Sequence, residues 1–239
     1  MTLLQYILFF VIICSSGLLF FYFKAIEKKY LKLILSFTGA FLFGLILMDL
    51  LPYVFESDIA HIGIYLLAGF FLQLVLEYFS EGIEHGHIHI HKTNDKTFPF
   101  GLMIGLSLHS FIEAMPLAGM QHAGHTHLFW GILLHHIPVA FALVAMLMHS
   151  GVSKYRTVVC LLIFALMSPL GAYVSSMLQG TELSGSEMFF RQSMAVVTGI
   201  LLHISTTILF EASNDHRFNL QKLITVAMGA SVALLLHLS

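Results

Sequence analysis

Eight apolar runs, each close to 20 residues long, are the feature that most restricts how this 239-residue chain can fold. A helix rises about 1.5 Å per residue, so each run can cross the roughly 30 Å hydrocarbon core of a bilayer. The runs cover residues 3–23, 33–52, 62–80, 98–120, 128–149, 155–178, 188–210 and 220–238. They predict an all-α integral membrane protein with eight transmembrane helices, in a single domain over residues 1–239.

The composition supports this fold class. Hydrophobic residues make up 58% of the chain and charged residues 10%, and the mean hydropathy is +0.88. No soluble domain has that balance, so the lipid bilayer is the expected surrounding. A net charge of −2 indicates that nucleic acid is not a partner. Cys14 and Cys160 both lie in apolar runs and are expected to be small core residues.

Basic residues predict the orientation of the chain in the membrane. If the first residue lies outside, the loops on the inner side contain ten of the 11 Lys and Arg residues, and Arg191 alone lies outside. Positive charge is retained on the cytoplasmic side of membrane proteins. We therefore expect a multi-pass protein of the plasma (inner) membrane, with both termini outside and a His-rich cytoplasmic loop at 81–97.

Two neighbouring runs carry ionisable side chains within the apolar region. His109 and Glu113 are four residues apart, so they share one helix face. His135 and His136 are adjacent in the next run. The two runs cross in opposite directions, and the rise of about 1.5 Å per residue places all four side chains at one depth.

Imidazole nitrogen and carboxylate oxygen suit Zn²⁺, Fe²⁺ or Mn²⁺. A carboxylate in the middle of a bilayer costs at least ~2.5 kcal/mol on insertion scales, which favours a functional role. Pro116 and Pro138 each remove a helix hydrogen bond beside the group and predict two kinked helices. A metal site is the interpretation we favour; the alternative is a protonated Glu113 hydrogen-bonded to His109, which would only hold two helices together.

Acidic and histidine-rich segments lie beyond the ends of the runs. Asp49, Glu56 and Asp58 cluster on the outer side, where they would attract an incoming cation. For Asp49, the alternative is an ordinary carboxylate at a helix end. The inner loop has four alternating histidines that either bind metal or form a solvated polar loop: His85, His87, His89 and His91. A second group on the outer side contains His122, His125 and His127.

Other polar residues within the runs have simpler interpretations. Glu77, four residues after Gln73, is expected to reach toward the inner interface. His203 is expected to be a hydrogen-bonded packing residue. The segment S-P-L-G from Ser168 predicts a kink and close helix packing. T-G-A-F-L from Thr38 and T-G-I-L-L from Thr198 run in opposite directions, which indicates an inverted repeat.

These motifs resemble those of the ZIP family of divalent metal transporters. H-S-F-I-E-A resembles the family's H-N/S-x-x-E-G, L-L-H-H-I-P-V-A resembles H-x-x-P-E-G, and D-L-L-P resembles H-L-L-P. The third run with its His-rich loop is similar too, so the resemblance covers nearly the whole chain.

The resemblance implies eight helices in a 3+2+3 plan with inverted repeats, a homodimer, and uptake of Zn²⁺, Fe²⁺ or Mn²⁺. It implies a metal site made of His109, Ser110, Glu113, His135 and His136. The chain departs from the family pattern in having Val139 where a carboxylate or another ligand is usual. It also has Ala114 and Ala140 in place of Gly, and Asp49 in place of His.

The expected function is transport of a divalent metal cation toward the cytoplasm, with Zn²⁺ as the first choice. The metal would be the substrate, and we expect neither a cofactor nor an enzymatic activity. One alternative is a membrane-embedded zinc hydrolase that uses the same ligands, with Glu113 or Asp49 as base. Another is a ZIP relative that binds metal without transporting it, because Val139 removes a carboxylate.

Overall fold

A computed structural model describes residues 1–23, 28–56, 58–80, 82–83, 98–118, 126–179, 186–211 and 220–238. The described part is helical and contains no strand. Its long α-helices are α1 (Leu3–Phe23), α2 (Lys28–Leu45), α4 (Ile62–Ser80), α5 (Phe100–Ala114), α7 (Thr126–His149), α8 (Lys154–Gln179), α9 (Ser186–Glu211) and α10 (Leu220–His237). Eight described segments are long and apolar enough to cross a membrane, which confirms the predicted fold class.

Two spans change from α-helix to another helix type partway along their length. The second span passes from α2 through a π-helical segment (Ile46–Leu50) into the short helix α3 (Leu51–Phe55). The fourth span leaves α5 at Ala114 and continues as the 3₁₀ turn η3 (Met115–Ala118), which contains Pro116. A proline cannot donate to the preceding turn, so the change of helix type falls where a kink was predicted. Pro138, in contrast, lies inside a continuous α7.

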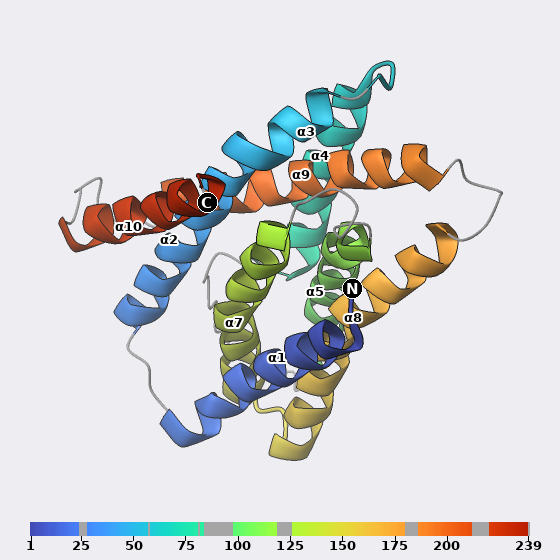
Figure 1. Cartoon of the computed structure of the whole chain (residues 1–239). Helices are drawn as coiled ribbons and strands as arrows, with labels where there is room; N and C mark the ends of the chain where they lie inside the picture. Colours follow the sequence, from blue (N-terminus) through green and yellow to red (C-terminus); the bar gives the residue numbers. More distant parts are fainter. Residues whose placement is uncertain are drawn as a thin grey trace.

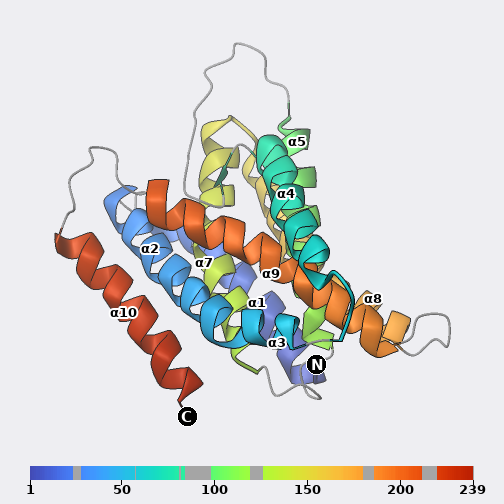
Figure 2. The same cartoon turned by 90° about the horizontal axis from the view of Figure 1, so that it is seen from above.

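The helix packing supports the predicted 3+2+3 plan. Figures 1 and 2 show α10 at one edge of the molecule beside α2, and α4 crosses α9. In an inverted repeat, α1 corresponds to α8, α2 to α9, α4 to α10, and α5 to α7. The contact between α2 and α10 then corresponds to the contact between α9 and α4. In the same way, the contact between α1 and α7 corresponds to the contact between α8 and α5, and all four contacts are extensive. One departure is that α4 packs along α5, whereas α10 makes no comparable contact with α7.

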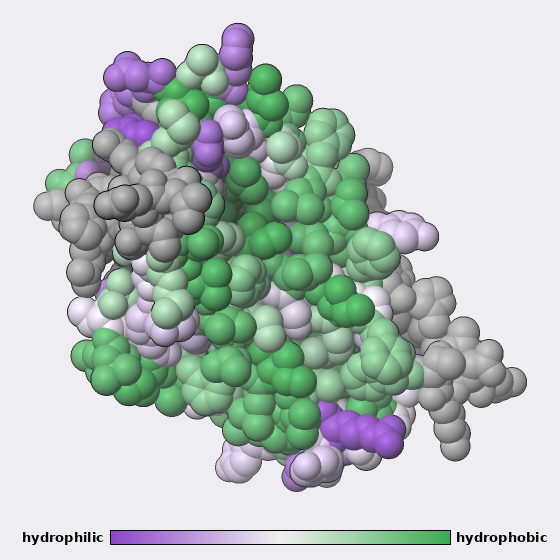
Figure 3. Space-filling view, turned by 90° about the vertical axis from the view of Figure 1, so that its right-hand side faces the viewer, coloured by the Kyte–Doolittle hydropathy of each residue, from purple (hydrophilic) through white to green (hydrophobic). Residues whose placement is uncertain are grey.

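Burial differs strongly among the spans. In the most apolar stretch of each helix, 83% of residues are buried in α7 but only 11% in α10. α7 is therefore the central helix, while α10 presents most of its surface outward. Figure 3 shows one side of the molecule, where hydrophobic side chains cover a broad band and hydrophilic ones gather at its two ends. This distribution is what a membrane-embedded surface requires.

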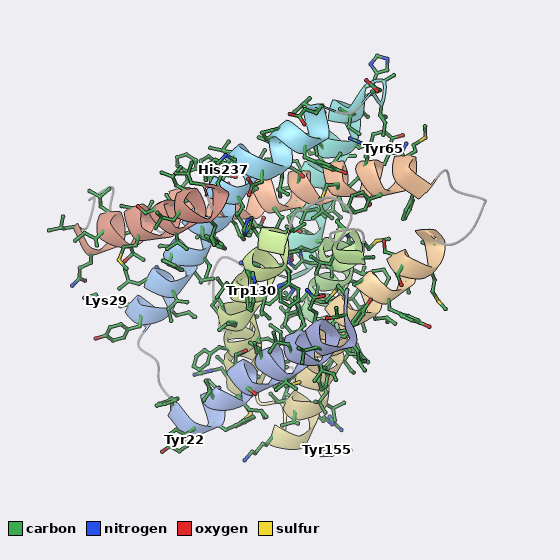
Figure 4. All side chains as sticks on the ribbon, in the orientation of Figure 1. Tyr22, Lys29, Tyr65, Trp130, Tyr155 and His237 are labelled. Atoms are coloured by element: carbon green, nitrogen blue, oxygen red, sulfur yellow. The ribbon has the colours of Figure 1, made fainter. Side chains whose placement is uncertain are left out.

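Several tyrosines lie near the ends of the spans. Figure 4 places Tyr22 and Tyr155 toward one end of the molecule and Tyr65 at the other. Tyr22 and Tyr155 are 81% and 79% exposed. Tyrosine is enriched where a bilayer meets water, because its ring is apolar and its hydroxyl polar.

Candidate metal site

A buried group of two histidines and one glutamate is formed by side chains that reach toward each other from α5 and α7. One ligand atom from each of His109, Glu113 and His136 lies within 4.8 Å of the others. The Nε2 atom of His109 is 3.0 Å from Glu113 Oε2, and that of His136 is 3.7 Å away from the same oxygen. None of the three side chains is more than 1% exposed. Among the described residues, this is the one group of three or more potential ligands at such spacing.

Hydrogen bonds orient both imidazole rings toward Glu113. The Nδ1 atom of His136 is 2.8 Å from the backbone oxygen of Ile132. A carbonyl oxygen only accepts, so Nδ1 carries the hydrogen and Nε2 presents its lone pair to the group. In the same way, His109 Nδ1–H donates to Gln73 Oε1 at 3.0 Å. Two imidazole nitrogens and a carboxylate oxygen thus converge, which is a ligand set that fits zinc.

Two serines extend the group toward α8. Ser110 Oγ is 3.0 Å from His136 Nε2 and 2.7 Å from Ser168 Oγ. Ser168 Oγ also lies 3.3 Å from the backbone oxygen of Ser110 and can donate to it. The hydroxyl of Ser110 therefore donates to the same imidazole nitrogen that faces Glu113, and Ser168 holds Ser110 in turn. Ser110 was a predicted site residue, whereas Ser168 was predicted only as part of a kinked and closely packed segment.

A close approach of α8 to α5 brings Ser168 to the site. The α8 residue Gly171 packs directly against the backbone oxygen of Phe111, and a Cβ atom there would collide with it. The S-P-L-G segment was predicted to pack closely, and it does so beside Ser110. A serine next to a close-packing glycine was therefore the sequence signal for this contact.

His135 is buried beside the group without belonging to it. Its ring centroid is 6.2 Å from that of His109 and 5.9 Å from that of His136. His135 thus lies next to the group of His109, Glu113 and His136, and its role as a metal ligand stays a prediction. Val139, one turn further along α7, is 1% exposed.

The predicted outer carboxylates lie away from this group. Asp49 is in the π-helical segment, and its Oδ1 is 2.5 Å from His237 Nδ1. Figure 4 shows His237 at the end of α10 that lies over α2. Glu56 and Asp58 are exposed. Their part in attracting cations stays a prediction.

The predicted loop ligands lie mostly outside the described residues. His85, His87, His89 and His91 are among the residues that the structure does not describe, as are His122 and His125. His127 is described and partly buried. Metal binding by either histidine group is thus still a prediction.

Glu77 has a hydrogen-bond partner on another helix. Its Oε2 is 2.6 Å from His203 Nε2, so it links α4 to α9 inside the protein. The facing imidazole of His203 gives Glu77 a partner within the bundle that was not predicted, and the expected reach of Glu77 toward the interface stays a prediction. The expectation that His203 is a hydrogen-bonded packing residue is confirmed.

The eight described helices of membrane-spanning length define an integral membrane protein, and the buried His/Glu group has the spacing of a possible metal site. The sequence matches the family described as ZIP Zinc transporter over residues 79–237, more than half of the chain. The chain therefore belongs to the ZIP family.

Individual relatives agree with this assignment. The chain is 30% identical to zinc transporter ZIP9 of Xenopus tropicalis over 167 residues, which cover 64% of this chain and 51% of that protein. It is 28% identical to zinc transporter ZIP1 of Danio rerio over 156 residues, with the same coverage of 64% and 51%. The chain thus spans about half the length of these curated relatives.

Proposed function

We propose that this protein transports a divalent metal cation, with Zn²⁺ as its first substrate, across the membrane toward the cytoplasm. The observation that carries the proposal is the buried group of His109, Glu113 and His136 within a bundle of membrane-length helices. Ionisable side chains at such positions are costly and mark ion pathways in membrane proteins. Membership of the ZIP family supports the same conclusion.

The metal site we propose consists of this group together with Ser110 and His135. The two Nε2 lone pairs and the Glu113 carboxylate replace water molecules of the ion. Without metal, the hydroxyl of Ser110 donates to His136 Nε2; when the ion binds, this bond is given up and the Ser110 oxygen can turn to the ion. A single carboxylate leaves a divalent cation with one net positive charge. This remaining charge weakens binding, and a transported ion has to be released as well as bound.

The route begins on the outer side, where Asp49, Glu56 and Asp58 attract the cation. It ends at the four loop histidines, on the side to which the basic residues assign the cytoplasm. Fe²⁺ and Mn²⁺ bind similar ligands and are competing substrates. Metal competes with protons for the imidazole nitrogens, so uptake should rise with pH through the range in which histidine loses its proton.

Metal flux into sealed vesicles that contain the purified protein tests this proposal. We expect a Zn²⁺-sensitive dye inside the vesicles to report uptake, and we expect Glu113→Gln to remove it because the variant loses the carboxylate. Glu77→Gln is the matched control, since Glu77 lies outside the metal group. Equal flux in the wild type and Glu113→Gln would contradict the proposed site.

The same preparation separates the two alternatives. Hydrolysis of peptide or amide-lipid substrates without metal flux would support the membrane-embedded hydrolase. Binding of Zn²⁺ without flux would support a relative that holds metal and does not move it. Either result would overturn the transport proposal.

A further inference from the structure

We propose that Gln73 is a positioning residue of the metal site, which fixes the ring of His109 so that its Nε2 faces the metal. The proposal rests on the proposed function for the identity of the site. Gln73 contributes no ligand itself and acts through His109. It was absent from the predicted site because it lies 36 residues away, on another span.

The ring of His109 is held from both sides. On one side, Gln73 Oε1 accepts a hydrogen bond from Nδ1 at 3.0 Å. On the other side, Nε2 lies 3.0 Å from Glu113 Oε2. Because the amide oxygen takes the hydrogen of Nδ1, Nε2 is the nitrogen whose lone pair faces the metal group. Without metal, that lone pair shares a proton with Glu113 Oε2, and a bound ion would take the place of this proton. Histidine ligands in metal sites are commonly oriented by such a bond from the second ring nitrogen.

Gln73 can impose this orientation because the helix that carries it is fixed against its neighbours. On α5, Gly105 lets the two backbones approach closely: a Cβ atom there would lie 2.9 Å from the backbone oxygen of Leu76. One turn beyond Gln73, Glu77 bonds to His203 of α9 at 2.6 Å. The amide therefore projects from a segment that is held by both α5 and α9.

Packing alone does not account for an amide at this position. Gln73 is 0% exposed, and its Nε2 atom makes no hydrogen bond to any described residue. A buried donor without an acceptor is unfavourable, whereas a leucine would fill a similar volume without that cost. The hydrogen bond to His109 is the described contact that uses the polarity of the side chain.

The test compares the wild-type protein with Gln73→Leu and Gln73→Glu. Leucine removes the acceptor, and glutamate keeps an oxygen at the same distance along the side chain. Gln192→Leu is the matched control, since it removes another hydrogen bond of α4, from Gln192 Nε2 to the Tyr65 hydroxyl at 3.0 Å. Two measurements are made on the purified proteins: the ¹⁵N chemical shifts of the His109 ring without metal, and equilibrium binding of Co²⁺ with its visible spectrum.

In the wild type we expect the metal-free His109 ring to carry its hydrogen on Nδ1. Gln73→Leu should shift that signature toward a mixture of tautomers, alter the Co²⁺ spectrum and weaken Co²⁺ binding by roughly 10- to 100-fold. Gln73→Glu should restore the Nδ1–H signature and most of the affinity. Gln192→Leu should leave both readouts at wild-type values.

Unchanged ring shifts and unchanged Co²⁺ affinity in Gln73→Leu would overturn the proposal. Equal losses in Gln73→Leu and Gln192→Leu would overturn it too, because they would indicate a general role of α4 in stability. Failure of the wild type to bind Co²⁺ would instead contradict the proposed function. The ring shifts are measured without metal, so they still decide whether Gln73 sets the tautomer.

Discussion

At the scale of single residues, the metal group has one carboxylate for an ion that carries two charges. Val139 is buried on α7 one turn beyond His135 and His136, on the face that these residues share. The family pattern that the chain resembles has a carboxylate or another ligand at this position. The affinity of the site should therefore depend on what stands there.

We predict that Val139→Glu raises Zn²⁺ affinity by roughly tenfold, which corresponds to about 1.4 kcal/mol. A second carboxylate supplies another oxygen ligand and neutralises the ion's remaining charge. Without metal, two nearby carboxylates retain one proton between them, so the gain should grow as pH rises and that proton is lost. Equilibrium binding across a pH series measures this.

Three further substitutions serve as controls, because they separate the effect of the added charge at residue 139 from the effect of side-chain shape and from loss of the site itself. Val139→Gln has the shape of glutamate without its charge and should give a much smaller gain. Glu113→Ala should abolish binding, and His109→Ala should weaken it strongly. If Val139→Glu has wild-type affinity and Glu113→Ala still binds Zn²⁺, the site does not lie between α5 and α7.

At the scale of elements, the contact between α5 and α8 holds the two serines of the site together. Gly171 makes that contact, because any side chain larger than hydrogen meets the backbone oxygen of Phe111. The hydrogen bond between Ser110 and Ser168 spans the same two helices.

We predict that Gly171→Val forces α8 away from α5, destabilises the protein by roughly 1–3 kcal/mol and weakens metal binding. Thermal unfolding and Zn²⁺ titration of the purified variant measure the two effects. Gly63→Ala is the control, since a Cβ atom there meets only an ordinary contact, with Phe55 at 3.9 Å. Wild-type stability in Gly171→Val would show that the helices tolerate a wider separation.

A second prediction at this scale concerns the loop after α4. Replacing His85, His87, His89 and His91 by serine should leave Zn²⁺ binding at the buried group unchanged, because His109, Glu113 and His136 all lie on α5 and α7. Release into the cytoplasm should slow, which vesicle flux would measure. Loss of binding at the buried group would mean that the loop supplies ligands to it.

For the whole molecule, orientation is the property to test. Ten of the 11 basic residues lie on one side if both termini are outside. Cysteines placed at Ser57 and Thr126 should then react with an impermeant reagent applied from outside, whereas one at Thr93 should react only after permeabilisation. Outside labelling at Thr93 would reverse the orientation and with it the proposed direction of transport.

The sequence predicts the helices of this architecture better than it predicts the contacts between them. Apolar run length predicted the spans to within a few residues, and a spacing of four placed His109 and Glu113 on one face. Periodicity within one helix does not determine how that helix is rotated against the others. The partners of Gln73 and Glu77 lie on other helices, so these contacts could not be predicted, whereas the S-P-L-G segment offered a signal for the contact of Ser168.

The position of α10 has a consequence for the order in which the protein assembles. Its extensive contact is with α2, where Gly229 lies against the backbone of Phe37 and Gly44 lies against Ala233. During synthesis, five other spans leave the ribosome between these two helices. The side of α2 that carries Gly44 therefore cannot pack on α10 until after α5, α7 and α8 have been synthesised. The packing of α10 on α2 is therefore a late step of assembly, and the metal site between α5 and α7 can form before it.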